Sequence, residues 1–135
     1  FMLPGAALAV VMDPSAVGPA AIFNLFLAIV STCLVASANY TINEWLDAEF
    51  DRHHPVKSTR PSALGLIRAE WVYAQYFALA VGGVAIAAQV NGPFLWTAVA
   101  LLVMGIVYNV RPLRSKDKRY LDVLSESINN PLRLM

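Results

Sequence analysis

The chain has 135 residues, of which 58% are apolar and 14% are charged, and its mean hydropathy is +0.56. A soluble domain carries about 25% charged residues, and a body this small would need more polar surface than these side chains supply. The composition therefore favours a lipid environment. A net charge of +1, with no basic face outside two short clusters, excludes a nucleic-acid-binding protein. The single cysteine excludes a disulfide scaffold.

The first half of the chain contains two apolar stretches. Residues 1–12 are too short to span a bilayer and predict the second half of a helix, which ends at the turn Asp13-Pro14-Ser15. Residues 20–38 have about the length that a bilayer core requires, roughly 20 residues. Cys33 lies within this span, and we expect it to be a small buried side chain.

The second half contains two further spans and the start of another. We predict helices over about 70–90 and 94–110, separated by the turn Asn91-Gly92-Pro93, and a fifth helix from about Tyr120. Small residues inside the spans predict closely packed helices; they are Gly82, Gly83 and Gly105. The chain starts with Phe1 and ends within the fifth predicted helix, so we expect it to be a piece of a longer protein.

Basic residues gather in alternate connections between the spans. The connection after the second span holds Arg52, Lys57, Arg60 and Arg68, and the connection after the fourth holds Arg111, Arg114, Lys116, Lys118 and Arg119. The turns near Asp13 and Asn91 hold no lysine or arginine. This pattern predicts that both basic loops face the cytoplasm, and orientation alone would explain their presence.

Polar residues recur on one face at the end of the second helix, whose sequence runs without a breaker to Asp51. A helix over 20–51 would be roughly 48 Å long, whereas a hydrocarbon core is about 30 Å thick. In its last turns Asn43, Asp47 and Asp51 follow at i, i+4 and i+8, and Asn39 lies one turn earlier.

This acidic face is energetically unfavourable unless a positive charge lies beside it. The carboxylates repel one another, oppose the helix dipole, and at membrane depth cost about 2.5–3.5 kcal/mol each. A divalent cation would offset these costs, and carboxylate and amide oxygens suit Mg²⁺. We therefore interpret Asn43, Asp47 and Asp51 as candidate Mg²⁺ ligands. The alternative is a solvated helix end, on which Glu44 and Glu49 add further surface charge.

Cations beside this face suit a bulky anion such as diphosphate. The candidate contacts are Lys57 and Arg60 in the first basic loop, and Arg114 and Lys116 with Tyr108 in the second. We interpret His53 and His54 as solvated loop residues rather than metal ligands. In the last segment Asp122, Ser125, Glu126 and Asn129 form a polar stripe at helical spacing, which would need an internal cavity. Asp122 would serve equally well as a helix cap.

Three motifs together resemble the UbiA superfamily of intramembrane prenyltransferases. The run from Asn43 to Asp51 resembles the first aspartate-rich motif of that family, N-x-x-x-D-x-x-x-D. The segment Lys57…Arg60-Pro61…Gly65 resembles the turn that follows it. The segment Tyr108…Pro112-Leu113-Arg114-Ser115-Lys116 resembles the Y-x-x-x-P-x-R-x-K loop. Glu44 stands where many members carry aspartate.

The resemblance implies an all-α, polytopic transmembrane bundle of nine helices, of which residues 1–135 would be the N-terminal part of a single domain. It implies two aspartate-rich motifs that bind Mg²⁺ and hold a prenyl diphosphate, whose isoprenyl group is transferred to an aromatic or other lipophilic acceptor. Asn43, Asp47 and Asp51 would form the first metal set. The basic candidates would contact diphosphate, and the stripe from Asp122 to Asn129 would line the acceptor pocket.

The second aspartate-rich motif is absent from these 135 residues, so we expect this chain alone to be inactive. Two other functions fit the acidic face. A membrane alcohol phosphotransferase would carry a D-G-x-x-A-R motif, which this sequence does not contain. A non-catalytic polytopic protein could bind or transport a cation there.

Overall fold

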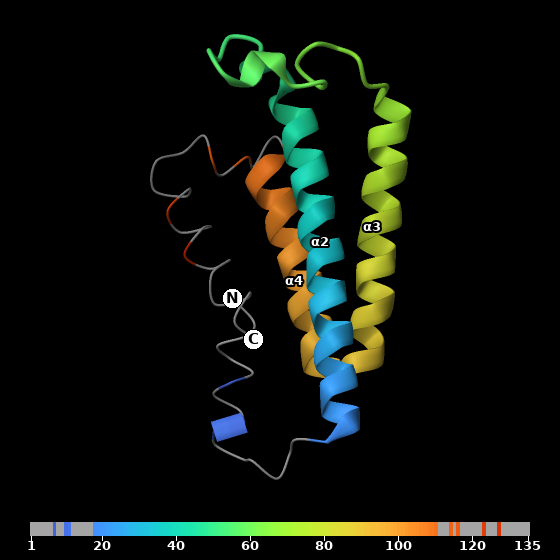
Figure 1. The fold of residues 1–135 in the computed structure, drawn as a ribbon. Coiled ribbons are helices and arrows are strands. Elements are labelled where there is room, and N and C mark those ends of the chain that lie inside the picture. The colour runs from blue at the N-terminus through green and yellow to red at the C-terminus, as the bar shows by residue number, and fades with distance from the viewer. Residues whose placement is uncertain are drawn as a thin grey trace.

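The computed structural model describes residues 7, 10, 11, 18–110, 114, 116, 123 and 127. In this part the secondary structure is helical, in the order α2 (Pro19–Asp51), η2 (Lys57–Thr59), α3 (Ala69–Val90) and α4 (Gly92–Asn109) (Figure 1). The polytopic all-α bundle predicted from the sequence is confirmed as a class. The predictions for Asp13-Pro14-Ser15, for the start at Tyr120, for Asp122, Ser125, Glu126 and Asn129, and for most of residues 1–12 lie outside the described residues.

Helix α2 is one uninterrupted helix of 33 residues, as the sequence predicts. Its N-cap Gly18 has an extended backbone, and Pro19 occupies the first turn, where its missing N–H leaves no hydrogen bond unmade. At 1.5 Å per residue the helix is about 50 Å long. Helices α2, α3 and α4 are each long and apolar enough to cross a membrane.

A tight turn at Asn91 reverses the chain between α3 and α4. The Asn91 side chain caps α4 by accepting a hydrogen bond from the backbone N–H of Phe94 at 2.7 Å. Helices α2 and α4 therefore run in the same direction and α3 runs opposite to them (Figure 1). The end of α2, the start of α3 and the end of α4 consequently lie at the same end of the bundle.

Small residues allow α2 and α3 to approach closely. A Cβ on Gly83 would lie 2.7 Å from Cγ2 of Val35, and the carbonyl of Gly83 accepts a buried 2.8 Å hydrogen bond from Oγ of Ser31. The close packing predicted at Gly83 is confirmed. Gly82 is looser, since its nearest neighbour would be Leu34 at 3.8 Å.

An amide fixes α4 against α2. Nδ2 of Asn39 donates to the carbonyl of Leu101 at 3.0 Å, and its carboxamide fills the space beside Gly105, where any Cβ would overlap it. The core cluster comprises Val35, Ala87, Ala98 and Leu101, with Phe94, Leu95 and Leu102 against it. The close packing predicted at Gly105 is therefore confirmed too.

Bulky apolar side chains face outward along the bundle, including Phe26 on α2, Phe77 on α3 and Trp96 on α4. The expectation that Cys33 is buried is wrong, because its side chain is exposed. Cys33 lies two positions from both Ser31 and Val35, which are fully buried. Two positions correspond to about 200° around a helix, so Cys33 belongs to the outer face.

Candidate functional site

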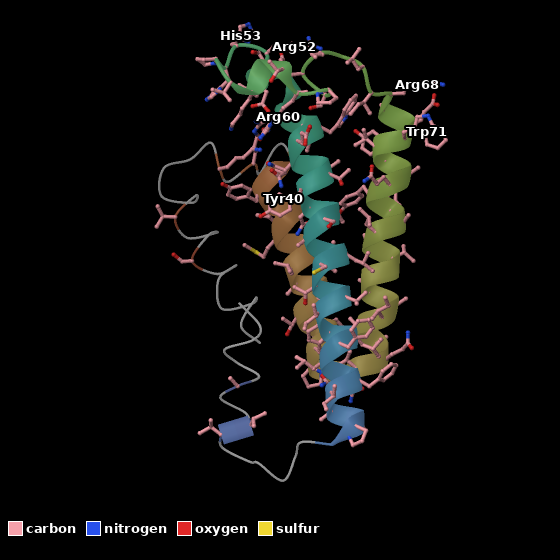
Figure 2. All side chains as sticks on the ribbon, viewed as in Figure 1. Tyr40, Arg52, His53, Arg60, Arg68 and Trp71 are labelled. Carbon is pink, nitrogen blue, oxygen red and sulfur yellow. The ribbon has the colours of Figure 1, made fainter. Side chains whose placement is uncertain are left out.

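Those predicted site residues that the structure describes gather where α2 and α4 end and the loop over residues 52–68 begins. Figure 2 shows Arg52, His53 and Arg60 at this end of the bundle, with Arg68 and Trp71 at the start of α3. The loop includes the short helix η2 and turns back toward α2. Among the described residues, the predicted site residues form two separate groups of ion pairs here.

The first group, the Asp47 cluster, consists of Asn43, Asp47, Asn109, Arg114 and Lys116. Nζ of Lys116 donates to Oδ1 of Asp47 at 2.6 Å, to Oδ1 of Asn43 at 2.9 Å and to Oδ1 of Asn109 at 2.9 Å. Nη2 of Arg114 donates to the same Asp47 oxygen at 2.9 Å. Side chains from α2, the end of α4 and the segment after it therefore share one network.

The cations of the Asp47 cluster are largely withdrawn from water. The side chains of Arg114 and Lys116 are 9% and 12% exposed, and that of Asp47 is 23% exposed. The Arg114 guanidinium lies 4.6 Å from the centre of the Phe50 ring, and Nζ of Lys116 lies 5.8 Å from that of Tyr108. Both contacts are within cation–π range, so aromatic rings help to hold both positive charges in place.

The second group, the Asp51 cluster, consists of Asp51, Lys57 and Arg60. Nη1 of Arg60 donates to Oδ2 of Asp51 at 2.8 Å, and Nζ of Lys57 lies 4.0 Å from Oδ1. The Asp51 side chain is 7% exposed, whereas those of Arg60 and Lys57 are 40% and 46% exposed. In the structure Asn43 and Asp47 therefore share Lys116, Asp47 also pairs with Arg114, and Asp51 pairs with the separate cations of the first basic loop.

The donor set around Lys116 fits a hard metal ion. One carboxylate oxygen and two amide oxygens converge on the position of the ammonium, and Mg²⁺ takes such oxygens together with substrate phosphates. Within the described residues, no three His, Cys, Asp or Glu side chains come together, and Asp47 supplies the carboxylate that contacts Lys116. The repulsion argument for a metal is weaker than the sequence suggested, because the protein's own cations already neutralise both aspartates.

Both histidines contact nearby backbone. Nδ1 of His54 accepts from the N–H groups of Val56 and Lys57 at 3.2 and 3.3 Å. Nδ1 of His53 lies 3.3 Å from the carbonyl oxygen of Glu49. Each contact spans at most four residues of sequence, so these side chains shape the exposed loop.

Three residues of this end of the bundle were not assigned a role from the sequence. Asn109 supplies an oxygen to the Asp47 cluster, and Phe50 supplies the ring beneath Arg114. Glu44, interpreted as surface charge, accepts a hydrogen bond from Ser62 at 3.0 Å. Asn109 could have been recognised as a site candidate because it is an amide that follows Tyr108 at the end of an apolar span. Phe50 could have been recognised because it lies three positions after Asp47, on the same face of the helix.

This architecture is that of an integral membrane bundle with paired acidic and basic groups at one end. The model of the UbiA prenyltransferase family matches residues 1–128, and the chain belongs to that family. No solved structure matches the chain.

Two kinds of characterised relative are similar to it. Over 76 residues, 52% of this chain, it is 40% identical to the decaprenyl-phosphate phosphoribosyltransferase of Corynebacterium glutamicum. Over 91 residues, 67% of this chain, it is 32% identical to the 4-hydroxybenzoate octaprenyltransferase of Cupriavidus necator. The matched segments make up 23% and 32% of these relatives, so the chain corresponds to a minor part of their length.

Proposed function

We propose that this chain supplies the first metal- and diphosphate-binding half-site of a Mg²⁺-dependent membrane prenyltransferase, within a single transmembrane domain. The observation that carries the proposal is the Asp47 cluster, in which oxygen ligands and buried cations meet at one end of an apolar bundle. Family membership supports the same class of reaction. The acceptor would be an aromatic or other lipophilic molecule.

The metal-binding side of this half-site would consist of Asn43, Asp47 and Asp51, with Asn109 as an additional oxygen donor. Bound Mg²⁺ would neutralise charge on the diphosphate leaving group. In the structure the oxygens of Asn43, Asp47 and Asn109 already converge on a cation. They need little rearrangement to accept another.

The diphosphate-binding side would consist of Lys57, Arg60, Arg114, Lys116 and Tyr108. Each of the four cations contacts an aspartate in the structure. A diphosphate carries several negative charges, so it would draw these cations from the carboxylates to its own oxygens. The carboxylates would thereby become available for metal, and the surrounding apolar helices would keep water from the reacting carbon.

The orientation and the acceptor pocket are part of the same proposal. The described cations Arg60, Arg114 and Lys116 all reach the last turns of α2, and the charge pattern of the sequence supports a cytoplasmic position for the site. We place the acceptor near the stripe of Asp122, Ser125, Glu126 and Asn129, beyond the residues that the structure describes.

Replacing Asp47 with asparagine in the full-length protein tests the proposal. The variant keeps an oxygen but loses the charge that pairs with metal, so turnover should fall by at least about 100-fold. Membrane insertion, measured by extraction and size-exclusion profile, should be unchanged. Glu49→Gln is the matched control, because Glu49 is exposed on the same helix. Wild-type turnover in Asp47→Asn would overturn the proposal.

A cation-binding or transport protein is the second candidate, because the three oxygens that hold the Lys116 ammonium also suit a metal cation. Isothermal titration distinguishes the two. A prenyltransferase should bind prenyl diphosphate more tightly with Mg²⁺ than without it. Metal binding that is indifferent to the diphosphate would favour transport.

A further inference from the structure

We infer that Glu44 is a positioning residue: its carboxylate holds Ser62 and thereby seats the loop that presents Lys57 and Arg60 to a diphosphate. This inference rests on the proposed function. Glu44 lies on α2 beside the candidate metal ligands, yet within the described residues it takes part in no ion pair. Its partner is the neutral hydroxyl of Ser62, whose Oγ donates to Oε1 at 3.0 Å.

The contact is buried on the loop side. Ser62 is 4% exposed and Ala63 is also 4% exposed, although the residues around them in the loop face solvent. A hydrogen bond to a charged acceptor in such a place is stronger than an exposed one. Ser62 is therefore one of the points at which this loop packs against α2.

Residues 60–66 form one compact turn, so that fixing Ser62 fixes its neighbours. The N–H of Leu64 donates to the carbonyl of Arg60 at 3.0 Å, and the N–H of Leu66 donates to the carbonyl of Pro61 at 3.0 Å. Gly65 adopts the left-handed conformation, with φ of +71°, which closes the turn without strain. The backbone that carries Arg60 is consequently held two residues from the Ser62 contact.

Two other contacts attach the same turn to α2. Nε of Arg52 donates to the carbonyl of Ala63 at 2.9 Å, and Arg60 pairs with Asp51 at 2.8 Å. When a diphosphate draws the Arg60 guanidinium away, the pair with Asp51 is lost. Of these three contacts, those of Glu44 and Arg52 remain to hold the turn, and Glu44 does not bind the ligand.

The length of the side chain matters for this role. Aspartate is shorter than glutamate by one carbon–carbon bond, roughly 1.5 Å, so Glu44→Asp would not reach Ser62 at the observed backbone separation. Glu44→Gln keeps an acceptor oxygen at the same reach but loses its charge. Ser62→Thr keeps the hydroxyl, whereas Ser62→Ala removes it.

The experiment compares these variants in the full-length protein. For Glu44→Asp and Ser62→Ala we expect a roughly tenfold rise in KM for prenyl diphosphate, with kcat changed less than about twofold. Ser62→Thr should restore near wild-type KM, and Glu44→Gln should lie between. Without substrate, the amides of Leu64 and Leu66 should exchange with deuterium faster in the first two variants. Glu49→Gln should change none of these values.

Each readout can overturn the inference separately from the proposed function. Unchanged amide exchange in Glu44→Asp and Ser62→Ala would show that the contact does not hold the loop. Faster exchange with unchanged KM would show that the loop position does not matter for the substrate. Additive effects in the double variant would show that the two side chains act independently. The turnover of Asp47→Asn tests the prenyltransferase assignment itself.

Discussion

Asp47 and Asp51 lie one helical turn apart on α2, but their cations come from different parts of the chain. Arg114 and Lys116 reach Asp47 from 67 and 69 residues away, after α4 has returned to the same end of the bundle. Arg60 reaches Asp51 from 9 residues away, within the loop that follows α2. The Asp47 cluster thus joins two helices, whereas the Asp51 cluster attaches a loop to its own helix.

The two clusters also differ in their exposure to water. The cations on Asp47 are nearly buried, and those on Asp51 are at least 40% exposed. Exposed ion pairs typically contribute about 0–1 kcal/mol, whereas removing one partner from a buried pair costs about 3–5 kcal/mol. The ion pairs of Asp47 are therefore expected to contribute more free energy than those of Asp51, although both aspartates lie on α2. Substitutions can measure this difference.

The largest expected effect separates the two lysines. Lys116→Met should weaken Mg²⁺-dependent diphosphate binding by about 30-fold or more, because a nearly buried cation with three oxygen partners is lost. Lys57→Met should weaken it by less than about fivefold, because the Lys57 side chain is about half exposed and lies 4.0 Å from Asp51. Titration calorimetry on the full-length protein measures both. Equal losses would contradict the distinction between the clusters.

A second effect should have the opposite sign. With no diphosphate present, Lys116→Met should bind Mg²⁺ more tightly than wild type by roughly tenfold, about 1.4 kcal/mol, because the ammonium no longer competes for the oxygens of Asn43, Asp47 and Asn109. Lys57→Met should leave that affinity nearly unchanged. Equal or weaker Mg²⁺ binding by Lys116→Met would show that these oxygens do not receive the metal.

A third effect concerns the helix contact below the Asp47 cluster. Gly105→Ala should destabilise the protein by about 1–3 kcal/mol, because its methyl group meets the Asn39 amide and pushes α4 from α2. Gly82→Ala should change stability by less than about 0.5 kcal/mol, since its nearest neighbour lies 3.8 Å away. Thermal denaturation in detergent compares them. If Gly82→Ala were the more harmful, the assigned packing would be wrong.

Much of the fold follows from local sequence. Continuous apolar runs and the turn residues at Asn91 specify the extent of α2 and where α3 gives way to α4, and the predicted boundaries agree with the structure to within two residues. The small residues at Gly83 and Gly105 indicated close helix contacts without saying which side chain would fill them. The contact between Asn39 and the backbone of Leu101 depends on how α2 and α4 are rotated relative to each other. Residue spacing within one helix cannot specify that rotation.

Several residues of the candidate site could be named from the sequence, among them Asp47 and Lys116, but their contacts could not. Helical periodicity predicted that Asn43, Asp47 and Asp51 share one face of a helix. The distribution of basic residues predicted that both basic loops lie on one side of the membrane. The separation of Asp51 from the other two depends on how a nearby loop folds back. The role of Asn109 depends on α4 ending level with Asp47. The fold of the loop and the end point of α4 are both tertiary properties, and neither produces a periodic pattern in the sequence.

The uninterrupted length of α2 has a consequence for how the surrounding lipid acts on this protein. One continuous helix of about 50 Å carries both the apolar segment near Phe26 and the charged end at Asp47, with no break between them. A thicker or thinner bilayer would therefore raise or lower the charged end relative to the headgroups, or change the tilt of the helix. Membrane thickness would therefore determine the depth at which an amphiphilic substrate must lie for its headgroup to reach the carboxylates of α2.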